Sequence, residues 1–391
     1  MSLPLEGLRV LEFGHAVMGP CCGMLMADMG AEVIHVEPTS GDNTRRLVGF
    51  GLGYFVMYNR NKKSLAVDLK TTSGRQIIYD LAPSTDIVVE NFGPGTIDLL
   101  GFGYEQMKGL NDRLIYCSLK GFLNGPYAKR HAMDEVVQMM GGLAYMTGRP
   151  GDPLRAGTAV IDISGGMFGY IGILQALYER ERSGKGKFVQ SALFETCAFL
   201  MGHNMAYASQ VDHPVPPMPA RVSAWSIYQI FDTRDGDKIF VGVISDKHWE
   251  RCCQAFGWQD WLGDERLANN NGRISEREWF LPAVETRLKQ FTKSEIAARC
   301  DKANIPFSPI ARPEDLFDDP QLNQSGALMW VRMPNGKDAK LPKIPIAYEG
   351  ATVTKRMDPP EIGAHTGPLL NELGYSKSQI ETLFRQNIIH M

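Results

Sequence analysis

The chain has 391 residues, of which 41 are Lys or Arg and 44 are Asp or Glu, so its formal net charge is −3 at pH 7. This near balance excludes a broad electrostatic attraction to nucleic acid or to an anionic lipid surface. Hydrophobic residues make up 44% and charged residues 22%, which excludes a wholly disordered chain, and the length suggests two domains.

The first residues, Met-Ser-Leu-Pro-Leu-Glu, lack the basic and apolar segments of a secretory signal. No uninterrupted apolar run reaches the length of about 18 residues that indicates a membrane span. The 7 cysteines match neither a disulfide framework nor a zinc site in their spacing. We therefore expect a cytoplasmic protein with reduced thiols and no metal centre.

The first half of the chain alternates short apolar runs with helical patterns. Strands are predicted at residues 8–13, 32–37, 86–90, 114–118 and 187–192. Helices are predicted at residues 19–29, 73–81, 96–107, 165–182 and 193–209. Strands separated by single helices imply βαβ units and a mainly parallel sheet, so we expect an α/β fold.

A proline-rich stretch from Pro214 to Pro219 has the composition of a linker. After it, two strand patterns flank an Asp-Gly-Asp turn and predict a hairpin, at residues 225–231 and 238–243. The predicted helices that follow are residues 246–256, 276–290 and 293–303. Two short strands are predicted within residues 328–346, around Pro334-Asn335-Gly336, and a last helix ends near Asn387.

Asp162 is the most informative single residue, because it directly precedes the helical pattern at 165–182. A carboxylate there either caps the helix by accepting backbone N–H bonds or acts as a nucleophile. In the second case the helix end and its glycines would leave backbone donors free for an oxyanion. Local sequence favours the cap, since aspartate caps are common, and does not decide between the two.

Motifs of nucleotide and hydrolase chemistry are absent from the sequence. Gly49, Gly51 and Gly53 lack the spacing of a dinucleotide fingerprint, and there is no Walker A, Gly-x-Ser-x-Gly or His-Glu-x-x-His motif. Several basic residues between the predicted elements form either a solvated charged face or contacts for a phosphate-bearing ligand: Arg45, Arg46, Arg60, Lys62, Lys63 and Lys70.

Short motifs follow one another along nearly the whole chain. They are residues 4–11, Gly19-Pro20, residues 29–34, Glu37-Pro38, Gly41-Asp42 with Arg45, residues 61–70, residues 90–95, Gly142-Leu143 with Thr147-Gly148, the Asp162 segment, residues 363–366 and residues 373–376. In this order they resemble the class III CoA-transferases, the CaiB/BaiF family that includes formyl-CoA transferase and carnitine CoA-transferase.

The resemblance implies a Rossmann-like large domain built from both chain ends, with a smaller α+β domain between them. Two ring-like subunits of this kind would interlock as a homodimer. The implied divisions are residues 1–210 for the N-terminal part of the large domain, 211–224 for a linker, 225–325 for the small domain, and 326–391 for the return linker and the C-terminal part of the large domain.

In that family, an aspartate at the position of Asp162 attacks the donor thioester and forms a mixed anhydride. CoA then attacks to give an aspartyl-CoA thioester, the acceptor carboxylate reacts, and CoA returns to the new acyl group. The anhydride keeps the acyl group activated without ATP, but it requires exclusion of water. The resemblance therefore implies acyl-CoA and a small carboxylate as the partners, with no permanently bound cofactor, no nucleic acid and no membrane.

Carried over position by position, the resemblance implies that CoA is contacted by Val17, Met18, Arg45, Val67, Lys70, Asn91, Phe92, Gly93, Arg130, His131 and Met133. Lys70 and Arg45 would neutralise its phosphates. Asn91 and Phe92 would shape the pantetheine channel.

Three positions depart from the family pattern. Leu99 stands where an arginine is common, Met133 where a tyrosine is common, and His131 where formyl-CoA transferase has a lysine. Its tetraglycine loop has no counterpart around residues 214–223. These departures favour a small di- or hydroxydicarboxylic acid of the succinate, mesaconate, itaconate or citramalate type over oxalate, with succinyl-CoA or acetyl-CoA as donor.

Two alternatives remain. One is a 2-methylacyl-CoA racemase of the same superfamily, which would deprotonate an α-carbon with a His and an Asp. Racemases carry His immediately before the acidic residue that corresponds to Asp134, whereas this chain has Met133 there and His131 two residues earlier. The other is a non-catalytic CoA-binding scaffold, which would form no covalent adduct.

Overall fold

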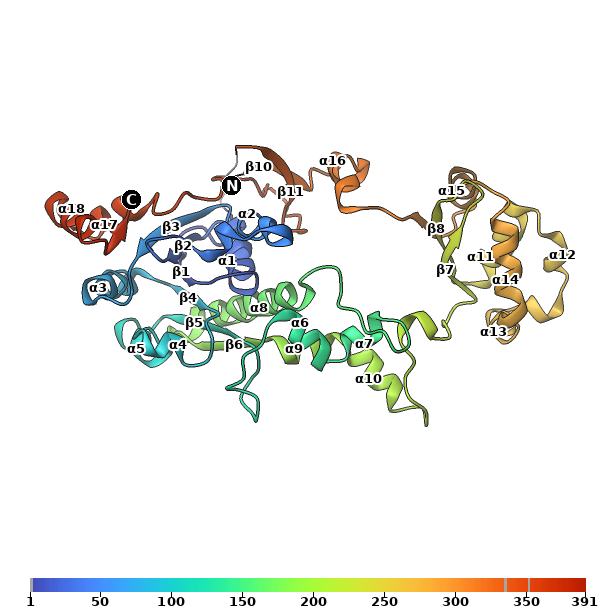
Figure 1. Cartoon of the computed structure of the whole chain (residues 1–391), viewed down its shortest axis with the longest axis horizontal. Coiled ribbons are helices and arrows are strands. Elements are labelled where there is room, and N and C mark those ends of the chain that lie inside the picture. The colour runs from blue at the N-terminus through green and yellow to red at the C-terminus, as the bar shows by residue number, and fades with distance from the viewer. Residues whose placement is uncertain (1–2, 334–335, 351) are drawn as a thin grey trace. The chain divides into compact units, whose positions relative to one another are not determined.

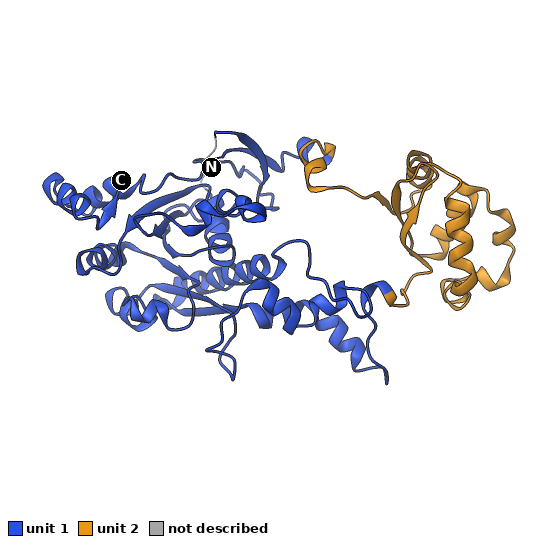
Figure 2. Cartoon of the chain, viewed as in Figure 1, with its two compact units in different colours: residues 1–219, 321–391 blue, residues 220–320 orange. Residues whose placement is uncertain are grey.

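The computed structural model describes residues 3–333, 336–350 and 352–391. The chain divides into two compact units (Figure 2). Unit 1 contains residues 1–219 and 321–391, and unit 2 contains residues 220–320. Both chain ends therefore belong to unit 1, and unit 2 is an insertion between them.

Unit 1 is built on a seven-stranded sheet in the order β12-β3-β2-β1-β4-β5-β6 (Figure 1). Six strands are parallel, and β12 runs antiparallel to β3. Their bounds are β1 (Arg9–Phe13), β2 (Glu32–Glu37), β3 (Lys62–Val67), β4 (Ile87–Glu90), β5 (Ile115–Lys120), β6 (Phe188–Ala192) and β12 (Ile389–His390). The predicted mixed α/β fold with a mainly parallel sheet is confirmed.

Alternate residues of the strands point to opposite faces of the sheet, so each face builds its own apolar core. Val10 belongs to the core that contains α1 (Met18–Asp28), α8 (Val160–Ser183) and α9 (Leu193–Leu200). Its neighbour Leu11 belongs to the core that contains α3 (Thr72–Leu81), α17 (Thr366–Glu372) and α18 (Lys377–Arg385). The remaining helices of the chain's first and last parts are α2 (Tyr54–Tyr58), α4 (Thr96–Leu99), α5 (Tyr104–Leu110), α6 (Asp134–Met140), α7 (Leu143–Thr147), α10 (Gly202–Ala208) and α16 (Pro320–Gln324).

The strands and helices that were predicted in unit 1 are present, but β12, α2, α6, α7 and α17 were not predicted, and four further differences concern longer elements. The strand β3 was not predicted, because its sequence begins with two lysines. The expected helix at 96–107 is two helices, since Gly101 adopts a φ of +90° between α4 and α5. The expected helix at 193–209 is divided into α9 and α10 at Met201. Finally, α8 begins at Val160, five residues before the predicted start.

The helix α8 is long and apolar enough to cross a membrane by length and composition, and it is the one helix of the described ranges that passes this test. It nevertheless packs against α1, β5, β6 and α9 in unit 1. These contacts are those of the core helix of an α/β unit.

Unit 2 has a three-stranded antiparallel sheet of β7 (Ile227–Asp232), β8 (Lys238–Val243) and β9 (Phe307–Pro309). The predicted hairpin and three helices are confirmed as β7–β8, α11 (Asp246–Phe256), α14 (Arg277–Leu288) and α15 (Lys293–Lys302). The helices α12 (Gln259–Leu262) and α13 (Asn270–Ser275) and the strand β9 were not predicted. Buried aromatic residues, including Trp249, Trp261 and Phe280, form its core.

The chain then forms an antiparallel pair of strands, β10 (Leu328–Arg332) and β11 (Asp338–Pro342), which confirms the two predicted strands. Pro334 and Asn335, expected between them, lie outside the described residues. The last predicted helix is confirmed as α18, which ends at Arg385. All seven cysteines are free and buried.

Candidate active site

A cavity of about 420 Å³ lies in unit 1 at the carboxyl ends of β1, β4 and β5. From β1 the chain continues to β2 and β3 on one side, and it then crosses to β4 on the other side of β1. In open α/β sheets, ligands bind at the carboxyl edge where the strand order reverses in this way. The cavity therefore occupies the position that the topology favours for a ligand.

The cavity is lined by Asp162 and by eight of the eleven residues that were expected to contact CoA. These eight follow β1, β4 and β5 in the chain, and they are Val17, Met18, Asn91, Phe92, Gly93, Arg130, His131 and Met133. The fold thus gathers residues that are more than 140 positions apart in the sequence around one carboxylate.

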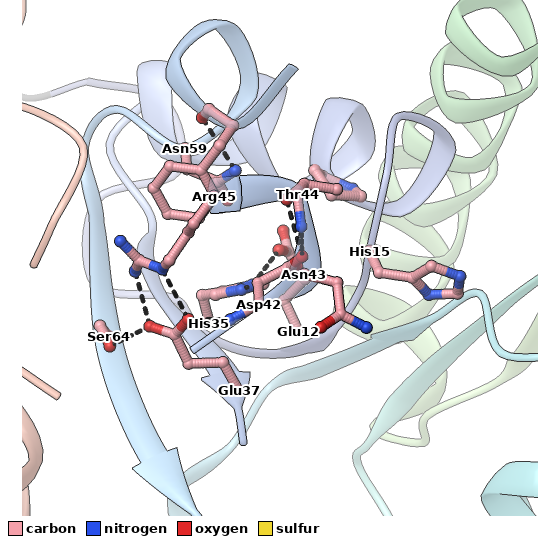
Figure 3. Close-up of polar contacts among 12 residues, drawn as sticks. Glu12, His15, His35, Glu37, Asp42, Asn43, Thr44, Arg45, Asn59 and Ser64 are labelled. Carbon is pink, nitrogen blue, oxygen red and sulfur yellow. Dashed lines mark hydrogen bonds and ion pairs between the residues drawn. The ribbon is translucent and has the colours of Figure 1, made fainter. Parts of the chain in front are cut away.

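Arg45 does not line this cavity. Its guanidinium donates to both carboxylate oxygens of Glu37, at 2.8 and 2.6 Å, and to the carbonyl of Pro360 at 2.8 Å. Figure 3 shows Glu37 between Arg45 and Ser64. Because this ion pair is largely buried, the charge of Arg45 is already neutralised within unit 1.

Val67 and Lys70 lie at the carboxyl end of β3, two strands away from β1 in the sheet. Parallel strands share one carboxyl edge, so these two residues lie along the same edge as the cavity without lining it. Val67 is buried and pairs with Ile389 of β12, whereas Lys70 is exposed. Their contact with CoA stays a prediction.

Arg60 and Lys62, in the basic segment at residues 60–63, serve neither of the purposes considered for them. The guanidinium of Arg60 is fully buried against Asp28, at 2.7 Å, and the ammonium of Lys62 is fully buried against Glu12, also at 2.7 Å. Lys63 pairs with Glu32. Carboxylates of the core hold these cations, so the expectation of a solvated face or a phosphate site is wrong for Arg60 and Lys62.

Asp162 is the third residue of α8, whose N-terminal cap is Ala159. The carboxylate of Asp134, on α6, accepts the backbone N–H of Ile161 at 2.8 Å and that of Asp162 at 3.0 Å. It also accepts the side-chain amide of Gln138. Asp134 therefore caps α8, and the sequence-based interpretation of Asp162 as the cap is wrong.

The same contacts correct the expectation of free backbone donors at this helix end, because Asp134 already accepts them. The glycines after Asp162 have a packing role instead. A Cβ at Gly166 would lie 2.6 Å from the carbonyl oxygen of Met18, and one at Gly165 would lie 2.6 Å from the Met18 methyl group. The two glycines let α8 approach the first turn of α1 closely.

The side chain of Asp162 stands without a partner: within the described ranges, no hydrogen bond or ion pair reaches its carboxylate. Burial, together with the nearby charge of Asp134, raises the pKa of Asp162 to about 7. A carboxylate whose pKa is raised in this way and that faces a cavity is a candidate for chemistry rather than for stability.

The loop between β1 and α1 is held in an unusual conformation. Ala16, which lines the cavity, has a φ of +61°, which is rare for a residue with a side chain. The side chain of Asn91 holds this loop through two hydrogen bonds to the backbone of His15. Its oxygen accepts the N–H of His15 and its amide donates to the His15 carbonyl, each at 2.9 Å. Such strain persists where the surroundings enforce it, and it is common at functional sites.

A buried network of charges joins Glu12 on β1, His35 on β2 and Asp42 in the loop after β2 (Figure 3). The ring of His35 donates to Glu12 at 2.8 Å and lies 3.5 Å from Asp42. Burial opposes its charge, but the nearby carboxylates of Asp42 and Glu12 raise the pKa of His35 to about 9, so the ring is protonated at neutral pH. Lys62 completes the network by donating to Glu12 and to the carbonyl of Pro20, the latter at 3.0 Å.

This network positions the first turn of α1, which supplies Val17 and Met18 to the cavity. Gly23 makes the arrangement possible, because a Cβ there would lie 1.6 Å from a carboxylate oxygen of Glu12. Sequence analysis assigned Lys62 only to a solvated face or a phosphate contact, and no role was predicted for Glu12, Gly23 or His35. One feature of the sequence could have indicated the network: ionisable residues, such as Glu12 and His35, lie within strands that are otherwise apolar.

Several other cavity residues were also missed: His15, Tyr54, Lys120, Asp134, Glu135 and Arg155. Arg155 and Glu135 form an ion pair at the cavity wall, and Lys120 pairs with Glu90 at 2.7 Å. The sequence held two signals: Arg155 stands seven residues before Asp162 in the same motif, and Asp134 occupies the acidic position considered for the racemase alternative. In the described ranges, no group of three or more His, Cys, Asp or Glu side chains could hold a metal ion.

Comparison with known proteins gives a consistent result. Residues 5–366 match CoA-transferase family III. The chain is 33% identical to a succinate–glutarate CoA-transferase of Agrobacterium fabrum, over 95% of this chain and 96% of that protein. It is 31% identical to a formyl-CoA:oxalate CoA-transferase of Escherichia coli O157:H7, over the full length of both. The crystal structure of a CAIB/BAIF family protein from Brucella suis matches with a TM-score of 0.83 and 32% identity, over 95% of this chain and 100% of that one.

Proposed function

The chain belongs to CoA-transferase family III, and we propose that it transfers CoA from an acyl-CoA donor to a small carboxylic acid through covalent intermediates on Asp162. One observation carries this proposal. The carboxylate of Asp162 faces a cavity at the switch point of the sheet, has no hydrogen-bonding partner among the described residues, and has its pKa raised to about 7.

In the proposed reaction, the ionised carboxylate of Asp162 attacks the thioester carbonyl carbon. The C–S bond breaks, CoA leaves as a thiolate, and an aspartyl anhydride remains. The thiolate then attacks the aspartyl carbonyl carbon of the anhydride, which releases the donor acid and leaves an aspartyl-CoA thioester. The acceptor carboxylate attacks this thioester to form a new anhydride and thiolate, and the thiolate attacks the acceptor's carbonyl carbon to give acyl-CoA and free Asp162.

The surroundings of Asp162 suit these steps. Asp134 fixes the backbone at Ile161 and Asp162, so the nucleophile occupies a defined position. The first N–H groups of α1 have no acceptor within the helix, and this helix begins at Met18 beside Asp162. We propose that these groups stabilise the oxyanions that form at the attacked carbonyl carbons.

For the acceptor, we propose an acid of the succinate or glutarate type. The relative from A. fabrum is named for succinate and glutarate, whereas the one from E. coli is named for oxalate, at similar identity. Met133 places an exposed apolar side chain on the cavity wall where tyrosine is common in the family. This wall suits a longer, partly apolar acid better than it suits oxalate.

We further propose that the large unit is Rossmann-like and that the protein is an interlocked homodimer. The strand order 3-2-1-4-5-6 is that of doubly wound nucleotide-binding sheets, which supports the first point. The exposed apolar residues Phe199 and Met205, on α9 and α10, support the second, since such residues are common at subunit interfaces. Light scattering coupled to size-exclusion chromatography tests for the dimer, and an exchange of tagged and untagged subunits tests the interlocking.

The experiment that tests the reaction is mass spectrometry of the protein after incubation with succinyl-CoA and glutarate. We expect an adduct on the peptide that contains Asp162, no adduct in Asp162→Ala, and loss of transferase turnover in that variant. Turnover close to normal in Asp162→Ala would overturn the mechanism. Deuterium uptake at the α-carbon of a 2-methylacyl-CoA without an acceptor acid would instead favour the racemase.

A further inference from the structure

We propose that Arg155 binds the free carboxylate of a dicarboxylic acceptor, and that Glu135 holds its guanidinium until the acceptor replaces it. The proposal rests on the proposed function and assigns the substrate class of that site to one residue. It begins from the observation that Arg155, Glu135 and Asp162 all line the same cavity.

The guanidinium of Arg155 is held by contacts in which an incoming carboxylate can take the place of Glu135. One Nη donates to a carboxylate oxygen of Glu135, and Nε donates to the carbonyl of Ala156 at 3.0 Å. The Glu135 side chain is 59% exposed and that of Arg155 is 34% exposed. Ion pairs that water can reach contribute little to stability, so exchange of Glu135 for a substrate carboxylate costs little.

The backbone beside Arg155 is fixed relative to Asp162 by one side-chain relay from α6. Gln138 accepts the N–H of Ala156 at 2.8 Å and donates to Asp134, which in turn accepts the N–H of Asp162. The cation and the nucleophile are therefore anchored to the same short helix. An acid that reacts at Asp162 with one carboxylate can extend its other carboxylate toward a guanidinium held in a defined place.

Three other basic residues of the cavity are less suited to this role. Lys120 is paired with the buried carboxylate of Glu90 and also donates to the carbonyl of Phe92. Burial lowers the pKa of His15, which favours its neutral form. Arg130 lies over the ring of Tyr127, 4.9 Å from its centre, in the segment expected to contact CoA. The planar fork of Arg155 also matches a carboxylate with two parallel hydrogen bonds.

The test compares acceptors that differ in one carboxylate: glutarate against butyrate, with acetyl-CoA as the constant donor. For Arg155→Gln we expect kcat/KM for glutarate to fall roughly tenfold to a hundredfold, which corresponds to loss of a charged hydrogen bond. For butyrate we expect less than about a threefold change, since it has no group for Arg155 to bind. If either acid binds without being turned over, its competitive inhibition constant is compared between wild type and variant instead.

Three further variants complete the design. Glu135→Gln removes the competing carboxylate, so we expect an unchanged or lower KM for glutarate. Arg149→Gln is the matched control, because Arg149 is exposed in the same connecting segment and does not line the cavity. Arg155→Lys keeps the positive charge but loses the planar guanidinium. We expect an intermediate loss of kcat/KM for glutarate and none for butyrate.

Equal losses for glutarate and butyrate in Arg155→Gln, no loss for glutarate, or a wild-type enzyme that accepts no dicarboxylate would each overturn the proposal. Thermal unfolding of each variant shows whether it is folded, and Arg155→Lys replaces Arg155→Gln where the latter is not. Labelling of Asp162 by acyl-CoA is measured in parallel. Absence of the label in wild type is a failure of the proposed function, whereas a label without acceptor discrimination is a failure of the role of Arg155 alone.

Discussion

The carboxylate of Asp134 accepts the backbone N–H of Asp162 at 3.0 Å, so one acidic side chain fixes the main chain of another. The two residues are 28 positions apart, on α6 and α8. The contact has two consequences. It holds the start of α8 in place, and it brings a second negative charge near the Asp162 carboxylate, which adds to the effect of burial on its pKa.

Acylation of Asp162 is expected to become faster with increasing pH, through an apparent pKa near 7, because only the ionised carboxylate attacks the thioester. The rate of the first covalent step, measured at a series of pH values by rapid quenching, checks this. In Asp134→Asn the neighbouring charge is lost, so the inflection should move to lower pH. A rate that is flat between about pH 5 and 8 would contradict the assignment.

Asp162→Asn is expected to stabilise the protein at high pH. Burial raises the pKa of Asp162 above its unfolded value, so the acid form favours folding at low pH, and this contribution is lost as pH rises from about 4 through 7. At pH 8 the variant should gain roughly 2–4 kcal/mol in the free energy of unfolding. At pH 4 the difference should nearly vanish.

Urea unfolding of wild type and Asp162→Asn at the two pH values measures this difference. The exposed Asp152→Asn serves as the control for the substitution itself. A stabilisation of Asp162→Asn that is the same at both pH values would show that charge burial is not its cause.

Gly23→Ala should destabilise the fold strongly. The added Cβ would lie 1.6 Å from the Glu12 carboxylate, in a core where that oxygen is held by Lys62. We expect a loss of about 2–4 kcal/mol, as for overpacked cores. Gly109→Ala is the matched control, because Gly109 lies in α5 with nothing within 4 Å of its Cβ position, and alanine there should be neutral or stabilising. Equal unfolding midpoints for the two variants would contradict the packing argument.

Lys62→Met should cost about 3–5 kcal/mol, because it leaves the buried carboxylate of Glu12 with one cation fewer. The double variant Glu12→Gln/Lys62→Met should lose much less than the sum of the two single losses, since both charges are then removed. A double-mutant cycle in urea measures this coupling. Losses that simply add would show that the two groups do not stabilise each other.

Sequence analysis predicted the alternation of strands and helices in unit 1 and the hairpin of unit 2. It also predicted the family, which the comparisons confirm, whereas the catalytic role of Asp162 stays a prediction. These features depend on apolar periodicity over a few residues, or on motifs that keep their order along the chain. Both can be recognised in the sequence alone. The start of α8 was misplaced because its cap is not local, since Asp134 caps it from another helix.

The side-chain partnerships needed the folded chain. The burial of Lys62 against Glu12 and the pairing of Arg45 with Glu37 depend on which strands become neighbours. The approach of Arg155 to Glu135 depends on how the loops meet at the sheet edge. The sequence does not distinguish a charged residue that is solvated from one that is buried or that faces a ligand. Its role follows from the solvent and the charges that surround it after folding.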